Sequence, residues 1–198
     1  EERLVRNYLP HRPMGMLLTG FDRTEATRHL LATSRIPCVH MMELSAAPGI
    51  ASVGFSQQAA GEAAAVHLLQ QGRKRLAYVA AQLDPRVMQR GEGFRRALQA
   101  AGVYDPALEL LHPLPSSIGL GCQLFRELMQ RHPDVDGIFF CNDDLAQGAL
   151  FEAQRSDLAV PGRVAMVGFN DLPASAHTVP RLSSIHTCLL YTSDAADE

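Results

Sequence analysis

Short apolar runs alternate with amphipathic stretches of helical period along most of this 198-residue chain. The apolar runs are about five residues long and the amphipathic stretches about twelve, the usual lengths of strands and crossover helices. This alternation is typical of right-handed βαβ units with parallel strands. Because a parallel sheet is normally covered on both faces, the pattern predicts an α/β fold of parallel sheets flanked by helices.

The pattern gives expected bounds for each element. Expected strands cover residues 14–18, 36–41, 50–54, 76–80, 108–111, 137–141, 164–168 and 182–185. Expected helices cover residues 24–31, 56–71, 87–101, 121–131 and 143–154. Thr24 and Ser56 are the expected N-caps of the first two helices, and Gly72 ends the second one.

The alternation starts again near Arg73, which predicts two lobes. We expect a partial amino-terminal lobe over residues 1–73 and a carboxyl-terminal lobe over residues 74–187. Ligands of open α/β sheets bind beyond the carboxyl ends of the strands. In a two-lobed protein these ends face a shared cleft, so the sequence predicts the architecture of a binding protein.

Both ends of the chain depart from this pattern. The chain opens at Glu1 in the middle of the pattern, without an initiator methionine, so we expect its natural start to lie upstream. Residues 188–198 resemble the in-frame translation of a sequencing adaptor, and a natural tail is the alternative. We therefore predict a non-native tail there and exclude it from the fold.

Composition excludes several classes of protein. The net charge of −3 gives no basic surplus for nucleic-acid binding by this chain. The chain has no apolar run of the roughly 20 residues that a membrane helix needs. Four cysteines lack the spacing of a zinc site or a disulfide framework, which favours buried thiols in a reducing cytoplasm.

The segment Asp84-Pro85-Arg86 predicts a helix start, with Asp84 as N-cap and Pro85 as the first helical residue. Arg86 and Arg90 are four residues apart and share one face of that helix. Two guanidinium groups beside a helix N-terminus favour an anion, and each can bind a carboxylate through two hydrogen bonds. A solvated basic helix face is the alternative interpretation.

Two further polar positions follow apolar strands. Asn142 and Asp143 come after the run at residues 137–141, where we expect Asp143 to cap the next helix and Asn142 to face the ligand. Asn170 follows Gly168, whose missing side chain permits a close backbone approach. An amide both donates and accepts, which suits the hydroxyl groups of a sugar-like ligand. A turn without a ligand role is the alternative at Asn170.

Catalytic and cofactor motifs are absent from the sequence. Gly119 and Gly121 form an isolated GxG without a third glycine, so a dinucleotide site is unsupported. The sequence contains no GxSxG or HExxH motif, and its eight histidines are dispersed. We therefore expect a protein that is not an enzyme and that uses no cofactor and no metal.

An ordered series of motifs from Met14 to Thr187 resembles the LacI/GalR family of transcriptional repressors. The series includes Val53-Gly-Phe55-Ser, Gln71-Gly-Arg-Lys-Arg75, Arg90-Gly-Glu-Gly-Phe94, Asn142-Asp-Asp144, Gly168-Phe-Asn-Asp171 and Pro180-Arg-Leu-Ser-Ser-Ile185. The resemblance implies an effector-binding domain with a two-lobed, periplasmic-binding-protein-like fold, truncated at both ends. It also implies that the DNA-binding headpiece is absent from this chain.

The resemblance places Arg90, Asn142 and Asn170 at positions that contact the effector. Phe55 matches an aromatic contact on the first lobe, and Glu43 matches a polar cleft position within one residue. Many relatives have Asp where this chain has Asn170. Loss of that carboxylate removes a repulsion against an anion, and Arg86 and Arg90 add attraction.

The sequences of these motifs are most similar to those of the gluconate-utilisation branch of the family. It therefore implies a sugar acid, such as gluconate or its phosphate, as the small-molecule effector of a cytoplasmic homodimer. Effector binding in the cleft would change the angle between the lobes and so the affinity for operator DNA. The alternative is a periplasmic sugar-binding protein of a transporter, which shares the two-lobed fold.

Overall fold

The computed structural model describes residues 1–45 and 47–187, in two compact units. The first unit covers Glu1–Gln57, and the second begins at Gln58 and includes the rest of the described chain. The boundary that the sequence pattern suggested, between residues 73 and 74, lies one helix later. The helix before Arg73 thus belongs almost entirely to the second unit.

The first unit is a small parallel sheet with helices. Its elements are α1 (Glu2–Tyr8), the 3-10 helix η1 (Leu9–His11), β1 (Met16–Thr19), α2 (Glu25–Ser34), β2 (Cys38–Met41) and β3 (Ala51–Val53). The strands pair in the order β1-β2-β3. The predicted strands and the helix near residue 24 are confirmed, and Thr24 caps α2 by accepting a hydrogen bond from the Thr27 amide at 3.2 Å. Helix α1 was not predicted.

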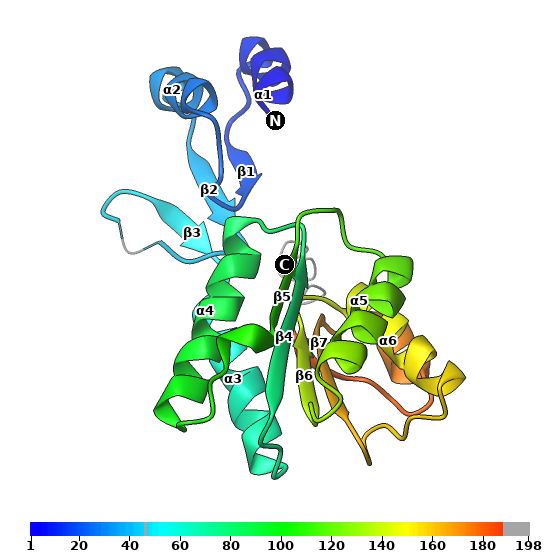
Figure 1. Ribbon diagram of the computed structural model, residues 1–198. Helices are drawn as coiled ribbons and strands as arrows, with labels where there is room; N and C mark the ends of the chain where they lie inside the picture. The colour runs from blue at the N-terminus through cyan, green and yellow to red at the C-terminus, as the bar shows by residue number, and fades with distance from the viewer. Residues whose placement is uncertain (46, 188–198) are drawn as a thin grey trace. The chain divides into compact units, whose positions relative to one another are not determined.

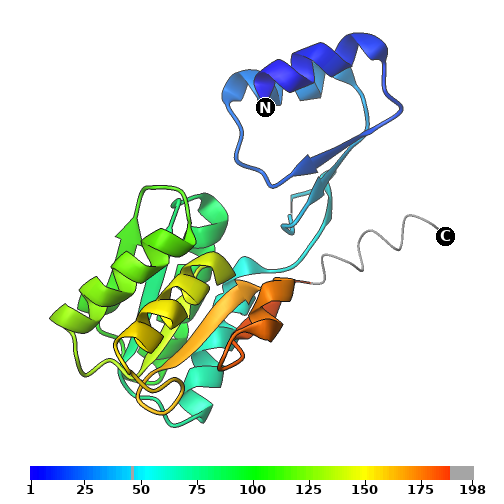
Figure 2. The same ribbon diagram turned by 90° about the vertical axis from the view of Figure 1, so that its right-hand side faces the viewer.

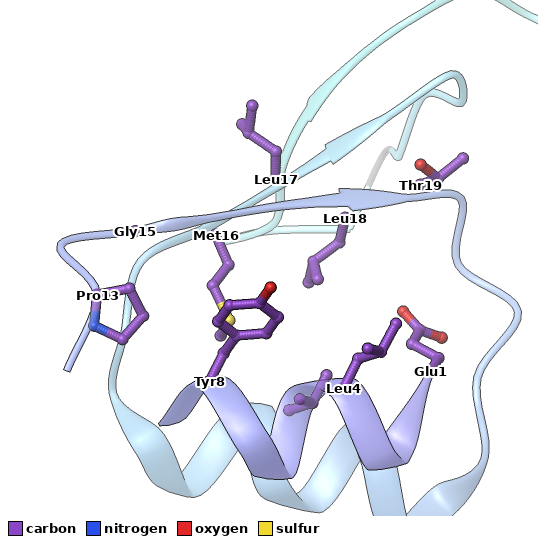
Figure 3. A pocket seen from close by; sticks show the side chains of 10 residues that line it. Glu1, Leu4, Tyr8, Pro13, Gly15, Met16, Leu17, Leu18 and Thr19 are labelled. Atoms are coloured by element: carbon purple, nitrogen blue, oxygen red, sulfur yellow. The ribbon is translucent and has the colours of Figure 1, made fainter. Parts of the chain in front are cut away.

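Both helices of this unit lie on the same face of its sheet (Figure 2). Figure 3 shows Leu18 directed toward α1, where Leu4 and Tyr8 also lie, and Leu17 directed to the opposite face. Accordingly, Leu18 is 8% exposed and Leu17 is 69% exposed. A cavity of about 570 Å³ separates α1 from β1. The alternation of side chains along β1 therefore gives this unit one covered face and one exposed apolar face among its described residues.

The second unit is a five-stranded parallel sheet. Its elements are α3 (Gln57–Gln70), β4 (Leu76–Ala81), α4 (Pro85–Ala100), η2 (Pro106–Leu108), β5 (Glu109–His112), α5 (Ile118–Arg131), β6 (Gly137–Phe140), α6 (Asp143–Arg155), β7 (Ala165–Asn170), η3 (Pro173–His177) and β8 (Ser183–His186). The strand order is β5-β4-β6-β7-β8, and every pair is parallel. Figure 1 shows α3 and α4 on one face of this sheet and α5 and α6 on the other.

The predicted strands and helices of this region are all confirmed, with ends shifted by a few residues. The largest difference is at α5, which begins at Ile118 rather than at residue 121, and β7 continues two residues further than expected, to Asn170. The central strands β4 and β6 are buried along their whole length. Tyr78, Phe94 and Phe139 form an aromatic cluster beside them, with ring centroids 5.4–6.0 Å apart. This burial on both faces explains the uninterrupted apolar runs.

Cysteines were predicted as buried thiols, and this is confirmed for one of them. Cys141 is fully buried, and burial raises the pKa of its thiol. Cys38 and Cys122 are only half-buried. Cys188, together with the rest of the predicted non-native tail, lies outside the described residues. No helix among the described residues has the length and apolar character to cross a membrane.

Glycines allow the helices on each face to pack closely. On one face, a Cβ at Gly148 of α6 would overlap the carbonyl oxygen of Ile118, and one at Gly121 of α5 would overlap that of Leu145. On the other face, Gly61 of α3 packs in the same way against the Arg90 carbonyl of α4. These positions accept glycine only, because any side chain would separate the backbones.

We expect Gly148→Ala to lower the free energy of unfolding by about 1–3 kcal/mol, because the added methyl group has no space between α5 and α6. Gly119→Ala is the matched control, since Gly119 is an exposed residue of α5 and its nearest neighbour to a new Cβ is the Ser117 hydroxyl at 4.0 Å. The control should change the free energy of unfolding by less than about 0.5 kcal/mol, because Gly119 is exposed in the first turn of the helix. Urea denaturation measures both, and equal stabilities would contradict the close packing.

Candidate functional site

The carboxyl ends of five parallel strands meet at one edge of the second sheet. Four residues that the sequence singled out follow these ends, namely Arg86 and Arg90 after β4, Asn142 after β6, and Asn170 at the end of β7. Because β4, β6 and β7 are neighbours in the sheet, the three connections are adjacent. This edge is where an open α/β sheet binds its ligand.

The start of α4 is as predicted. Asp84 is the N-cap and accepts a hydrogen bond from the Val87 amide at 3.0 Å, and Pro85 is the first helical residue. Arg86 is half-buried, with a guanidinium nitrogen 3.5 Å from the Asp84 carboxylate. The carboxylate compensates part of the Arg86 charge, so Arg90 is the stronger candidate for binding an anion.

Arg90 is a buried cation, with 7% of its surface exposed. Its guanidinium carbon lies 4.0 Å from the centre of the Phe169 ring, which is a cation–π contact. Burial lowers the pKa of Arg90 from its ordinary value. An arginine nevertheless keeps its proton, because its pKa is so far above neutral. The result is a positive charge with little water around it at the edge of the sheet.

Phe169 was not selected as a site residue from the sequence, although it directly precedes Asn170. Its place at the end of an apolar strand is typical of a core residue, and it is indeed 2% exposed. The stacking on Arg90 depends on β6 lying between β4 and β7 in the sheet and on the position of α4. No local sequence signal indicates that contact.

The expected roles of Asn142 and Asp143 were wrong in part. Asn142, not Asp143, is the N-cap of α6, and its side-chain oxygen accepts a hydrogen bond from the Leu145 amide at 3.1 Å. Its amide nitrogen donates to the Ser116 hydroxyl at 2.6 Å. Both residue types cap helices well, so the sequence did not distinguish them. Ser116, which follows β5, is a neighbour of the site that the sequence did not reveal.

Asp143 is completely buried and connects three segments. Its carboxylate accepts hydrogen bonds from the Ser175 hydroxyl at 2.8 Å, the Ser184 hydroxyl at 2.6 Å and the Leu172 amide at 2.7 Å. Burial raises the pKa of Asp143, whereas these three hydrogen bonds lower it. The carboxylate therefore fixes the turn after β7 to the start of α6.

Gly168 permits this arrangement. A Cβ at Gly168 would overlap a carboxylate oxygen of Asp143. The close approach expected at Gly168 is thus present, but the approaching group is the Asp143 side chain.

Asn170 and Asp171 both have left-handed backbone conformations, with φ of 104° and 53°. Asparagine and aspartate are the residues, after glycine, that best tolerate positive φ. The Asp171 carboxylate lies 2.9 Å from Nδ1 of His186, at the end of β8. Asn170 is half-buried and thus retains a partly accessible amide at the strand edge.

Glu43 and Phe55 belong to the first unit. Glu43 is buried, and its carboxylate accepts a hydrogen bond from the Phe21 amide at 3.0 Å, so it supports the loop after β1. A Cβ at Gly20 would come within 2.7 Å of the same carboxylate, which explains the glycine there. Phe55 lies in the connection from β3 to α3 and is half-buried. Glu43 and Phe55 therefore belong to a different unit from Arg90, Asn142 and Asn170.

These features define a class of protein. A parallel α/β domain with a buried arginine and amide side chains at its strand edge has the architecture of a domain that binds small molecules rather than a nucleic-acid module. Among the described residues, no group of three His, Cys, Asp or Glu side chains could hold a metal ion.

Comparisons with known proteins identify the family. Residues 65–194 match the family of periplasmic binding protein-like domains. The chain is 63% identical over 187 residues to the HTH-type transcriptional regulator GntR of Pseudomonas aeruginosa, covering 94% of this chain and 54% of that protein. It is 30% identical to GntR of Escherichia coli K12, covering 94% and 56%. The chain belongs to the periplasmic binding protein-like domain family, in the form found in LacI/GalR-type regulators.

Solved structures agree with this assignment. A transcription regulator GntR from Chromobacterium violaceum has a TM-score of 0.90 at 45% identity, covering 93% of this chain and 68% of that one. A LacI-family regulator from Silicibacter pomeroyi has a TM-score of 0.91 at 27% identity, covering 98% and 59%. The chain spans about half the length of the curated relatives that it matches.

We expect Asp143→Asn to lower the free energy of unfolding by about 1–3 kcal/mol. The NH₂ group of the new amide would face Leu172, Ser175 or Ser184, which themselves donate hydrogen bonds to this position. Asp144→Asn, one residue further along α6 and half-buried, is the matched control and should cost less than about 1 kcal/mol, the value of a helix-dipole interaction. Chemical denaturation of both variants tests the difference. Indistinguishable variants would show that the Asp143 hydrogen bonds contribute nothing to stability.

Proposed function

We propose that this chain is the ligand-sensing domain of a DNA-binding transcriptional repressor of carbohydrate metabolism, with gluconate or a related sugar acid as effector. The observation that carries the proposal is the buried Arg90 guanidinium, stacked on Phe169 at the carboxyl edge of the strands. A buried cation at this edge favours an anionic ligand. The names of the relatives support the same class, since they include GntR and IdnR regulators.

The proposed ligand contacts follow from side-chain chemistry. The Arg90 guanidinium would bind the carboxylate of the sugar acid through parallel hydrogen bonds, and Arg86 would add long-range attraction. The side-chain oxygen of Asn142 caps the helix, and one of its two N–H groups donates to Ser116. Its second N–H is therefore the group left to donate to a sugar hydroxyl. Asn170 would donate to or accept from another hydroxyl. Phe169 would support the site by holding Arg90 in place.

We further propose that Phe55 serves as an aromatic contact and Glu43 as a polar contact for the sugar acid. Binding then favours one of two pre-existing arrangements of the units, to the extent that the ligand binds one arrangement more tightly. In a cytoplasmic homodimer that carries a DNA-binding headpiece, this shift changes the affinity for operator DNA.

The alternative of a transporter's periplasmic sugar-binding protein has less support. The curated relatives quoted above are described as transcriptional regulators, and none of those descriptions names a transporter. A structural relative at 29% identity and TM-score 0.81 is described as the regulator CelR in complex with cellobiose, so a regulator of this fold does bind a sugar. These relatives favour the sensor and, equally, argue against an enzyme.

Isothermal titration of the chain with gluconate tests the site. Loss of a charged pair costs about 1.5–3 kcal/mol, so Arg90→Ala should weaken gluconate binding roughly 10- to 100-fold. Arg96→Ala, at an exposed position of the same helix α4, is the matched control and should bind as the original chain does. Glucose, which has no carboxylate, should bind weakly to all three proteins.

Arg90→Lys separates charge from geometry in the same experiment. Lysine keeps the charge but cannot bind a carboxylate in the bidentate manner. The gluconate affinity of Arg90→Lys should therefore lie between those of the original chain and Arg90→Ala. Thermal denaturation confirms that each variant is folded. Equal gluconate affinities for the original chain and folded Arg90→Ala would remove Arg90 from the site.

A further inference from the structure

A second cavity lies at the opposite end of the sheet from the candidate site. It has a volume of about 260 Å³ and is lined by the first residues of β7 and β8, the last part of α3, and the segments around Pro161 and Pro180. All of these belong to the second unit. The cavity is separated from Asn170 and His186 by the length of β7 and β8, because those residues end the strands that the cavity's lining begins.

The ionisable residues that line this cavity are all basic. His67, Arg73 and Arg181 line it, and no aspartate or glutamate is among the described residues that do so. Ser183 adds a hydroxyl group. His67 and Arg181 are exposed and thus free to turn toward a ligand, whereas Arg73 is half-buried. Three basic side chains without a carboxylate in the lining make this cavity selective for anions.

Arg73 is held in a fixed position. Its guanidinium donates to the Pro161 carbonyl at 2.6 Å and to the Gly162 carbonyl at 3.3 Å. Its Nε atom, in contrast, is buried and has no hydrogen-bond partner among the described residues. Buried donors nearly always have an acceptor in native proteins. The two terminal nitrogens of the guanidinium keep one further N–H each, and an acceptor in the cavity would accept hydrogen bonds from these groups.

We propose that this cavity is a second ligand site, which binds a small phosphate-type oxyanion. Arginine binds phosphate strongly through charge-assisted hydrogen bonds, and donors from Arg73, Arg181, His67 and Ser183 suit a tetrahedral dianion better than a flat carboxylate. The volume of about 260 Å³ is below the roughly 300–1,000 Å³ of typical pockets for drug-sized ligands, which favours a small ion over a nucleotide. Free phosphate and the phosphoryl group of a small phosphorylated sugar acid share the required chemistry.

Such a ligand would connect parts of the chain that are distant in sequence. Arg73 lies between α3 and β4, and Arg181 lies between η3 and β8. An anion bound to both side chains would fasten the β8 edge of the sheet to the end of α3. The site therefore would stabilise the second unit, and its existence does not depend on the function proposed for the strand edge.

Titration with inorganic phosphate at constant ionic strength tests the proposal. The chain should bind phosphate, and Arg181→Gln should weaken that binding at least tenfold. Because Arg181 is exposed, its replacement leaves the fold intact. Arg96→Gln, an equally exposed arginine on α4, is the matched control and should bind phosphate as the original chain does. Arg73→Lys, which keeps the charge but lacks the planar guanidinium held by the Pro161 and Gly162 carbonyls, should also weaken binding.

Two further titrations identify the source of the phosphate and the place where it binds. Tighter binding of 6-phosphogluconate than of inorganic phosphate, lost in Arg181→Gln, supports a phosphorylated sugar acid, whereas binding of inorganic phosphate alone supports the free ion. Phosphate binding should persist in Arg90→Ala. Its loss there with retention in Arg181→Gln would place the ion at the strand edge and overturn the proposal. Absence of any phosphate or 6-phosphogluconate binding would also overturn it.

Discussion

Parallel pairing of the five strands in the second sheet is the constraint on which the rest of the structure depends. Because β5, β4, β6, β7 and β8 all run in the same direction, every connection must cross from one end of the sheet to the other. Helices therefore cover both faces, and all strands end at one common edge. That edge collects the side chains of Arg90, Asn142 and Asn170 from segments that are up to 80 residues apart in the sequence.

Close contacts between backbones keep this arrangement rigid. Glycines at positions 61, 121 and 148 let α3 pack on α4 and α5 pack on α6 without intervening side chains. The Asp143 carboxylate then attaches the turn after β7 to the start of α6 through three hydrogen bonds. These hydrogen bonds hold one of the loops at the candidate ligand edge in a defined position.

The two ends of the second sheet carry different chemistry. At the carboxyl edge, one buried arginine is combined with amide groups, which suits a hydroxylated anion. At the other end, Arg73 and Arg181 line a cavity of about 260 Å³. The first edge is the place where open α/β sheets in general bind ligands, whereas the second cavity depends on the particular side chains of this chain.

The sequence by itself determined the α/β class, the order of strands and helices from β1 onward, and the helix start at Asp84-Pro85, because these depend on local periodicity and capping. It also indicated which strand ends carry polar groups. Only the tertiary structure decided that Phe169 stacks on Arg90, that Asn142 rather than Asp143 caps α6, and that the units divide after Gln57. Those features depend on which strands are neighbours and on contacts between distant segments, and local patterns along the chain carry no information about either.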